Sequence, residues 1–536
     1  MKRMKALIAV LLAACLLVAL FAACAKTEAP ADTTPAKTDT PAKTDEPAKT
    51  EEPAKTDEPA KTEEPAKTEE PEEPTEVIFW ISDVYAHGAD HLDRLSAAIN
   101  AITEPNGVTV KPNFMNIGEW ISKVQTSLIS GERVDLMCYS AGSGITGMVM
   151  RNMAMDMTDY LNEYAPETLD LMADYIGACT YGGRIYGVPT LRSYVTNGYF
   201  CFNQDMLDEA GLTDLAKNMT TWSEYEQVLA GLYDKFFDQG CYPAAPSLGT
   251  MIASTGYYIH GDKFADIENV DTLGASAGVV YTDGEGHVSF AQAKEEYKYA
   301  LVKTKEWLDK GWLHPDGVYD SQYRADDAIT SRVAASELCG SELGVEATKT
   351  MRYGAPALCV KQRSGMIQTS TLTGWGIGIP ITSEEPEAAC KLINMLYTSE
   401  PLMRIFVNGV EGEDYEIVDG VAQQKDNMYS NGNFILGNNL LALPLVGNDP
   451  DMYDQIRAEN AAAQISPYLG FTLDNTELEL LISQITAVTD QYSCYLCCGA
   501  YSDADYAEYL DKLEAAGVQD YLDAVQAQLS AWLASK

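Results

Sequence analysis

The sequence predicts an α/β fold of two lobes, and three observations support this. Apolar runs typical of strands alternate with amphipathic segments typical of helices after residue 76. Strands that alternate with helices in this way form a parallel sheet covered by helices on both faces. The globular composition continues from Val77 to Lys536, and these 460 residues exceed what one hydrophobic core accommodates.

Individual elements follow from the hydrophobic pattern at the start of this region. Strands are predicted over residues 76–82, 108–114 and 134–139, and helices over residues 91–102 and 120–129. Gly131 marks the end of the second helix. Because parallel sheets bind ligands at the carboxyl ends of their strands, the side chains at these ends are candidates for a binding site.

Aromatic and polar side chains gather at the carboxyl ends of the first and third strands: Trp80, Ser82, Asp83, Tyr85, Tyr139 and Ser140. Each is a candidate for ligand contact. For Trp80 and Tyr139 the competing interpretation is packing in the core of the sheet. For Asp83 it is solvation or an ion pair.

The first 24 residues have the pattern of a secretory signal. Basic residues precede an apolar run over residues 6–23, and Phe21-Ala-Ala precedes Cys24. Small residues before a cysteine resemble a bacterial lipobox, in which the cysteine takes a diacylglycerol and becomes the mature N-terminus. We expect Cys24 to be lipidated and the protein to lie on the extracellular face of the cell membrane. Cys15 also fits the pattern, although cleavage there would leave a second apolar run, and an uncleaved anchor is the remaining alternative.

Residues 25–76 form a repeat that cannot fold by itself. The unit Pro-Ala-Lys-Thr followed by acidic residues recurs up to Pro71, and the segment contains no aromatic residue. Such a composition buries too little apolar surface to offset the entropy of ordering the chain. We therefore expect a disordered spacer between the anchor and the globular region.

The charge balance narrows the class of ligand. The chain carries 37 basic and 79 acidic residues, a net charge of −42, and residues 77–536 account for −36 of it. A surface this acidic disfavours nucleic acid, anionic membrane faces and anionic ligands. Neutral or cationic small molecules fit better.

Ten cysteines remain beyond Cys15 and Cys24. Six of them lie singly in apolar segments and are predicted to be small buried hydrophobic residues: Cys138, Cys179, Cys201, Cys339, Cys359 and Cys390. The one cluster, Cys494, Cys497 and Cys498, lacks the further Cys or His ligands of a structural zinc site. Packing is the preferred interpretation of the cluster, and a disulfide or redox role is the alternative.

Two motifs point to cofactors but lack the right context. Gly142-Ser-Gly144-Ile-Thr-Gly147 matches the dinucleotide pattern, yet it follows the third strand, and no second strand ends in an acid about twenty residues later. His87 and His91 have the spacing of one helix face, but the segment follows a strand and lacks the Glu of a zinc-protease motif. We predict neither a cofactor nor a metal.

Several motifs in fixed order carry a resemblance to a known family. They are Tyr186-Gly-Val-Pro189, Gly198 to Leu212, Thr221-Trp222-Ser-Glu-Tyr, Gly374-Trp375-Gly-Ile-Gly-Ile-Pro380, Glu387-Ala-Ala and Leu396-Tyr. Together they resemble family 1 extracellular solute-binding proteins, the ligand-capturing subunits of ABC importers. The segment Gly409-Val-Glu411-Gly-Glu-Asp-Tyr415 and the stretch after Leu513 are similar to the LipO-type lipoprotein subgroup.

The resemblance implies a two-lobe clamp of the periplasmic-binding-protein type. Lobe one would comprise about residues 77–195 and 377–442, and lobe two about residues 196–376 and 443–536. The chain would cross between the lobes near residues 189–199, 374–379 and 442–446. Ligand binding would close the hinge, and an ABC permease in the membrane would recognise the closed form. The resemblance also implies a monomer.

The resemblance further implies an oligosaccharide as the most frequent ligand. Sugar rings present an apolar face that stacks on aromatic rings and hydroxyls that need hydrogen-bond partners, and the chain has 31 Tyr and 7 Trp. Trp375, beside glycines at an expected crossover, is the predicted stacking platform. Arg192 and Glu411 join Asp83 as candidate polar partners, with solvation or ion pairing as the alternative. Trp222, Trp307 and Trp312 are predicted to pack in the core.

The function that follows is a membrane-anchored, substrate-binding component of an ABC importer that captures a neutral solute and has no enzymatic activity. A surface sensor or adhesin on the same clamp is one alternative. A secreted glycan-active enzyme is another, since acidic residues are abundant and the separation of paired carboxylates is not visible in a sequence. Within the preferred function the ligand is an oligosaccharide, a polyol or a peptide.

Overall fold

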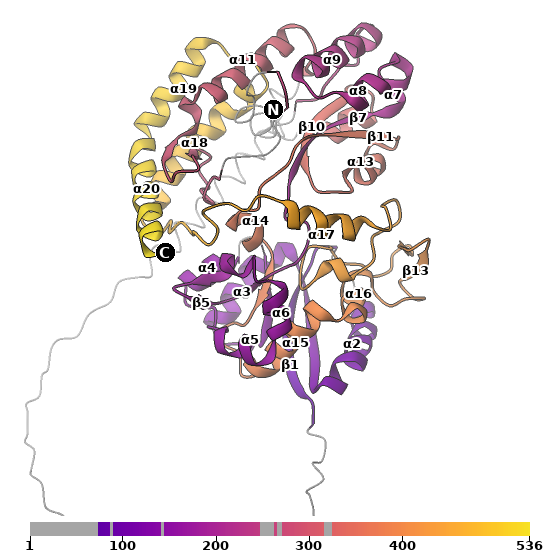
Figure 1. The fold of residues 1–536 in the computed structure, drawn as a ribbon, viewed down its shortest axis with the longest axis vertical. Helices are drawn as coiled ribbons and strands as arrows, with labels where there is room; N and C mark the ends of the chain where they lie inside the picture. Colours follow the sequence, from indigo (N-terminus) through magenta and orange to yellow (C-terminus); the bar gives the residue numbers. More distant parts are fainter. Residues whose placement is uncertain (1–72, 86–88, 141–143, 247–261, 265–270, 316–323) are drawn as a thin grey trace, which may run out of the picture. The chain divides into compact units, whose positions relative to one another are not determined.

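The structure is a computed structural model that describes residues 73–85, 89–140, 144–246, 262–264, 271–315 and 324–536 (Figure 1). The chain separates into two units, Met1–Glu69 and Glu70–Lys536. The fold reported below is that of the second unit. The predictions for Cys24, the repeat, His87 and Gly142 fall outside the described residues.

The first sheet confirms the predicted strand–helix alternation. Its strands are β1 (Thr75–Asp83), β2 (Val108–Asn116), β3 (Leu136–Tyr139), β12 (Gly376–Gly378) and β6 (Val188–Pro189), in the order β2-β1-β3-β12-β6. β1 pairs in parallel with β2 and β3, as expected for strands joined through helices. β12 is antiparallel to both β3 and β6, so the sheet is mixed at this side.

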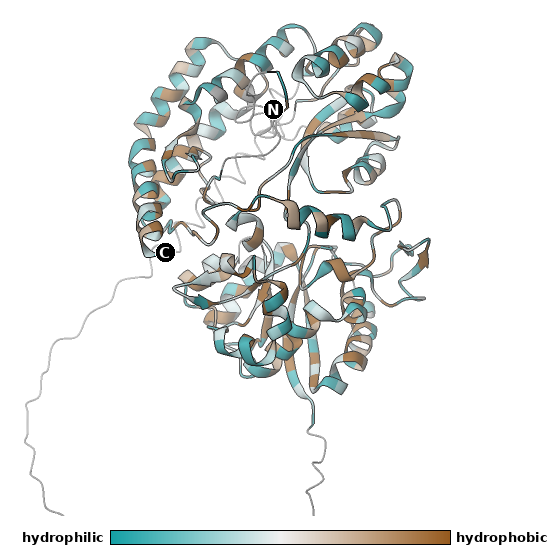
Figure 2. Cartoon of the chain, viewed as in Figure 1, coloured by the Kyte–Doolittle hydropathy of each residue, from teal (hydrophilic) through white to brown (hydrophobic). Residues whose placement is uncertain are grey.

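Helices cover this sheet with apolar side chains. They are α2 (Ala89–Thr103), α3 (Ile117–Ile129), α4 (Ile145–Met150), α5 (Thr158–Tyr164), α6 (Pro166–Leu171), α15 (Pro386–Thr398) and α16 (Glu400–Asn408). Each contributes to one hydrophobic core that also contains Val77, Phe79 and Ile81 of β1. Figure 2 shows apolar residues along the strands and polar residues on the outward turns of the helices.

The second sheet is antiparallel, which differs from the predicted parallel arrangement. Its strands are β7 (Asn197–Asn203), β10 (Ser336–Ser341) and β11 (Ala357–Arg363), in the order β10-β7-β11. β10 and β11 are joined through α13 (Val345–Tyr353) and run parallel to each other, because both are antiparallel to β7. The strand–helix–strand pattern is therefore present, but β7 lies between its two strands.

The helices packed on the second sheet carry the predicted core tryptophans. They are α7 (Gln204–Ala210), α8 (Thr213–Asn218), α9 (Trp222–Phe236), α11 (Glu295–Asp309) and α12 (Ala325–Thr330). A capping box between Thr221 and Glu224 starts α9 and directs Trp222 inward. Trp222 and Trp307 are buried and their ring centroids lie 6.1 Å apart, which confirms their predicted core role. Trp312 is half-buried against the same core.

The C-terminal helices form a separate apolar cluster. They are α18 (Glu479–Cys497), α19 (Asp503–Ala515) and α20 (Val518–Ser535), and they pack on the hairpin of β8 (Val280–Thr282) and β9 (Val288–Phe290). The remaining main elements are β4 (Thr180–Tyr181), β5 (Arg184–Ile185), α14 (Thr369–Thr373), β13 (Tyr415–Val418), β14 (Val421–Gln424) and α17 (Met452–Ala462). Within the described ranges, no helix combines the length and the apolar character needed to cross a membrane.

The isolated cysteines behave largely as predicted. Five of the six are buried free thiols, and Cys359 is half-buried. Cys201 and Cys339 lie on adjacent strands with their Sγ atoms 3.3 Å apart. In the C-terminal cluster Cys498 is buried, and the side chains of Cys494 and Cys497 fall outside the described part of the chain.

Two chain segments connect the sheets and touch where they pass each other. The chain leaves the first sheet after Pro189 and enters the second at Asn197, and it returns between Arg363 and Gly376. A Cβ on Gly365 would lie 2.3 Å from the carbonyl oxygen of Thr196, so only glycine fits at this contact. The Gly365 N–H donates to the buried Asn197 Oδ1 at 3.2 Å.

Helix α17 contacts the first connecting segment and the two neighbouring strands β7 and β11 through two consecutive side chains. Asn460 accepts from the Tyr194 N–H at 3.0 Å and donates to the Arg192 carbonyl at 2.7 Å. Glu459 accepts from Asn197 Nδ2 at 2.9 Å and from Lys361 Nζ at 3.1 Å. The first connection, the start of β7 and the end of β11 are therefore held by one helix.

The short strand β12 fits into the first sheet because it contains two glycines. A Cβ on Gly376 would lie 2.6 Å from the carbonyl oxygen of Val188, and a Cβ on Gly378 would lie 2.3 Å from the ring of Tyr139. Gly187 faces the same ring, at 2.9 Å from a Cβ placed there. The Tyr139 ring thus occupies the space that side chains would fill at positions 187 and 378.

We predict that Gly378→Ala destabilises the protein by about 3 kcal/mol, because overpacking of this size displaces the buried Tyr139 ring. The measurement is the urea unfolding midpoint. Gly177→Ala is the matched control, since a Cβ there meets no atom within 4 Å and the backbone is not left-handed. An unchanged midpoint for Gly378→Ala would contradict the packing described here.

Candidate ligand-binding site

The carboxyl edge of the first sheet brings two predicted site residues together. Trp80 pairs with Met137, and continuing this register places Asp83 beside Ser140. Asp83 Oδ1 accepts from the Tyr85 N–H at 3.0 Å. The hydroxyls of Ser82 and Ser140 are buried and have no hydrogen-bond partner within the described ranges. Unsatisfied hydroxyls at the end of a buried strand are rare in folded proteins and mark an edge able to bind a polar group.

Trp80 and Tyr139 lie in the core rather than on this edge. They are 2% and 1% exposed, and the Tyr139 hydroxyl donates to the Tyr186 carbonyl at 3.2 Å. Burial raises the pKa of Tyr139 well above its ordinary value. Almost no surface of either ring is free to meet a ligand, so the structure favours the packing interpretation for both residues.

Trp375 lies where α14 ends and β12 begins, and it keeps part of its surface exposed. Its ring meets Phe434 edge to face, with ring centroids 4.9 Å apart, and its carbonyl accepts from the Thr190 N–H. Phe434 is also half-buried. Packing against Phe434 fixes the Trp375 ring, which a stacking platform requires, but the sequence did not reveal this pairing.

A small cavity begins at the residue before Trp375. It has a volume of about 240 Å³ and is lined by Thr146, Leu273, Gly274, Thr369, Ser370, Thr373, Gly374, Phe471, Thr472, Leu473 and Asn475. Its hydroxyls and amide alternate with the apolar surface of Phe471. Such a mixture suits a ligand with both hydroxyls and apolar faces.

Arg192 is engaged in holding the first connecting segment. Its guanidinium forms an ion pair with Glu342 at 2.6 Å and donates to the carbonyls of Ser193 and Thr371. These contacts join the connection to the end of β10 and to α14. The structure therefore favours ion pairing, the alternative stated for this residue, over direct ligand contact.

Glu411 is exposed, and the structural role in its motif belongs to Asp414. The Asp414 carboxylate receives two hydrogen bonds from Arg94, at 2.6 and 2.8 Å, and one each from the N–H groups of Val410 and Tyr429. Burial by itself would raise the pKa of Asp414, but these hydrogen bonds outweigh it and hold the pKa below its ordinary value. Only glycine fits at position 409, because a Cβ there would lie 2.5 Å from Asp414 Oδ2.

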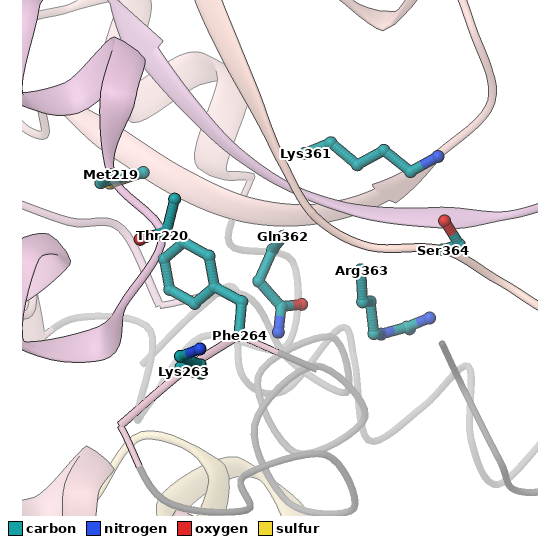
Figure 3. Close-up of a pocket in the computed structure, with 8 residues that line it drawn as sticks. All are labelled: Met219, Thr220, Lys263, Phe264, Lys361, Gln362, Arg363 and Ser364. Carbon is teal, nitrogen blue, oxygen red and sulfur yellow. The ribbon is translucent and has the colours of Figure 1, made fainter. Parts of the chain in front are cut away.

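A larger cavity lies at the end of β11, and none of the predicted site residues lines it (Figure 3). Its volume is about 530 Å³, within the range of small-molecule sites. The lining residues belong to the segment before α9, to residues 262–264 and to the end of β11 with the residue after it: Met219, Thr220, Lys263, Phe264, Lys361, Gln362, Arg363 and Ser364. One aromatic ring, one thioether and several hydrogen-bonding groups therefore surround the same space.

One exposed group has the composition of a cation site. Asp283, Glu285 and His287, in the turn between β8 and β9, bring ligand atoms within 4.8 Å of one another. His287 Nδ1 contacts Asp283 at 2.8 Å, and the same carboxylate accepts from two backbone N–H groups of the turn. These contacts explain the arrangement as a hydrogen-bonded turn.

Two α/β sheets joined by short connections, with cavities lined by both apolar and polar side chains, are the architecture of a solute-binding protein, and the comparisons with known proteins agree. The model of a bacterial extracellular solute-binding protein family matches residues 97–409, more than half of the chain. The chain belongs to this family. Residues 467–534, which include α18 to α20, match a domain of unknown function (DUF3502).

Individual relatives cover most of the chain at low identity. A carbohydrate ABC transporter substrate-binding protein of Streptococcus pneumoniae serotype 4 (strain ATCC BAA-334 / TIGR4) is 24% identical in an alignment of 477 residues that covers 83% of this chain and 89% of the relative. The crystal structure of an N-glycan transport solute-binding protein from Streptococcus pneumoniae has a TM-score of 0.71 at 19% identity, covering 86% of this chain and 99% of that one. A solute-binding protein from Bifidobacterium longum infantis, described as HMO binding, has a TM-score of 0.60 at 14% identity and covers the same shares. These structures are two-lobe solute-binding proteins, which confirms the predicted clamp fold.

We predict that Asp414→Asn lowers the free energy of unfolding at pH 7 by about 3 kcal/mol, because it leaves Arg94 without its buried carboxylate partner. The folded-state pKa of Asp414 is depressed, so its stabilising contribution is complete above the unfolded pKa and is lost as the pH falls through the folded pKa. The difference between wild type and variant should narrow below about pH 4.

Urea unfolding at pH 7, 5, 4 and 3 measures this difference. Glu411→Gln, at an exposed position in the same motif, is the control and should unfold like the wild type at every pH. A difference between wild type and Asp414→Asn that stays constant down to pH 3 would show that the ion pair is not its source.

Proposed function

We propose that this protein is the membrane-anchored substrate-binding component of an ABC importer and that it captures an oligosaccharide and delivers it to a permease. The observation that carries the proposal is the carbohydrate ABC transporter relative, whose similarity extends over 83% of the chain. The two-lobe fold supports it, because a ligand held between two sheets joined by a hinge can close the lobes around itself.

The chemistry of the described surfaces supports a sugar in particular. Phe264 lines a cavity whose other walls carry hydroxyls and an amide, and Trp375 follows Gly374, which lines the smaller cavity. Sugars need both kinds of contact at once. We propose Trp375 as a stacking residue and Asp83 and Ser140 as polar contacts at the carboxyl edge of the first sheet. Of the other residues predicted from sequence, we propose that Trp80 and Tyr139 support the site from the core and Arg192 supports it through its ion pair with Glu342, while Glu411 stays a proposed polar contact.

We propose to divide the chain into segments as the two-lobe clamp implies. Residues 1–24 would be a lipoprotein signal, residues 25–76 a spacer, and residues 77–536 the solute-binding domain. Lobe one would hold about residues 77–195 and 377–442, and lobe two the rest. We propose that binding and release, without a chemical step, are the whole activity, since the family is one of solute-binding proteins.

We predict that Cys24 carries the lipid that holds the protein on the extracellular face of the membrane. Expressed in a bacterium with a lipoprotein pathway, the wild type should fractionate with membranes, and intact mass spectrometry should show a diacylglyceryl Cys24 as the first residue. Cys24→Ala should lose this mass, whereas Cys15→Ala should keep it. A mature protein that begins at a lipidated Cys15 would contradict this prediction.

We predict that a neutral glycan raises the thermal unfolding midpoint of the purified protein and that amino acids and peptides do not. A ligand that binds only the folded state, at 100 times its dissociation constant, adds about 2.7 kcal/mol of stability. Trp375→Ala should abolish most of the shift, because it removes the stacking face, while Trp312→Ala, at another half-buried tryptophan, should keep it. If only peptides shift the unfolding midpoint, the proposal of a sugar ligand is wrong. If no compound in the panel shifts it, the proposed function is wrong.

A further inference from the structure

The end of β11 departs from regular pairing at one residue that lines the larger cavity. Lys361 pairs with Tyr199 and Arg363 pairs with Gly198, so Gln362 is an extra residue without a partner position on β7. Such a β-bulge bends the strand and redirects a side chain, and bulges are frequent beside functional sites. Figure 3 shows Gln362 extending from the strand toward Phe264 and Lys263.

The Gln362 side chain lacks the hydrogen bonds that a buried amide normally makes. It is 3% exposed, and neither Nε2 nor Oε1 has a hydrogen-bond partner among the residues that the structure describes. Leaving both atoms unpaired costs stability, and folded proteins seldom retain such a group without a reason. A ligand that pairs with both atoms would remove this cost when it binds.

The strand opposite the bulge leaves room for the amide. A Cβ on Gly198 would lie 2.8 Å from Gln362 Oε1 and 3.0 Å from Arg363 Cγ. Any other residue at position 198 would therefore push the amide away from its place. The bulge, the unpaired amide and the facing glycine are separate features of the chain, and all three act on the position of Gln362.

The amide selects the chemistry of its partner. In one plane it offers a donor, Nε2–H, and an acceptor, Oε1, on the same side. Two adjacent sugar hydroxyls satisfy both, since one hydroxyl accepts while its neighbour donates. A trans peptide group directs its N–H and C=O to opposite sides and can satisfy only one of the two. The Phe264 ring and Met219 supply the apolar wall that the CH face of a sugar needs.

We propose that the cavity at the end of β11 is a pyranose subsite in which Gln362 binds a pair of adjacent hydroxyls and Phe264 packs against the sugar ring. This inference rests on the proposed function and adds to it a residue that selects the ligand. Gln362 acts through direct contact, so a change of its side chain alters affinity for sugars that carry both hydroxyls.

The test is isothermal titration calorimetry of the purified full chain with mannotriose, cellotriose and maltotriose. For the trisaccharide that binds, Gln362→Met should weaken binding about tenfold or more, since it keeps the length of the side chain and removes both hydrogen bonds. The ligand-free variant should unfold at the same temperature as the wild type or higher, because the unpaired amide is gone. A residue with a merely structural role would lower this temperature instead.

Two further variants and one ligand change sharpen the result. Gln362→Glu keeps an acceptor and removes the donor, so an intermediate loss of affinity is expected even if Gln362→Met folds poorly. A monodeoxy trisaccharide that lacks one of the two hydroxyls should show a smaller difference in affinity between wild type and Gln362→Met, because only one of the two hydrogen bonds remains to be lost. Gln423→Met, at an exposed glutamine of β14, is the matched control and should bind like the wild type.

The outcomes separate this inference from the proposed function. A trisaccharide that binds wild type and Gln362→Met with equal affinity would overturn the subsite and leave the sugar-binding function standing. A chain that binds none of the sugars, in this experiment or in the thermal panel, would overturn the function and the subsite together. Weakened binding by Gln362→Met with unaltered binding by Gln423→Met supports the subsite.

Discussion

The contact between the two segments that connect the sheets is the constraint on which the rest of the structure depends. Gly365 lies against the Thr196 carbonyl so closely that a Cβ would stand 2.3 Å from the oxygen. Because the two segments pass at this distance, the start of β7 lies beside the end of β11, and the two strands can pair in one sheet. From this contact the returning chain continues to α14 and then to β12 of the first sheet.

Polar side chains and apolar packing together hold this crossing. Asn197 bridges the two segments, and α17 contacts the first of them through Asn460. Tyr194 of the first segment and Ile367 of the second are buried in the core of the first sheet. A hinge built in this way suits a protein that closes on a ligand, since only a few backbone angles need to change. The apolar cores lie on either side of the crossing and would move as rigid bodies.

The candidate site shows how the fold supplies binding groups at a cost to its own stability. The hydroxyls of Ser82 and Ser140 and the amide of Gln362 are buried without partners, at the ends of three strands that belong to two different sheets. The buried Asp414 carboxylate, by contrast, accepts four hydrogen bonds. The hydroxyls of Ser82 and Ser140 and the Gln362 amide have no such bonds to the described residues. They are the groups that a ligand with many hydroxyls would satisfy.

The sequence by itself determined the class of fold, the three parallel strands of the first sheet, the inward position of Trp222 and the family. These depend on local patterns, because apolar periodicity, helix caps and motif order are written along the chain. It could not decide between core and site for Trp80 and Tyr139, since a buried strand end has the same composition in both cases. Only the tertiary structure paired Trp375 with Phe434, inserted β7 between β10 and β11, and redirected Gln362 through a bulge opposite Gly198. These features arise from contacts between segments far apart in the chain, and no local pattern encodes such a contact.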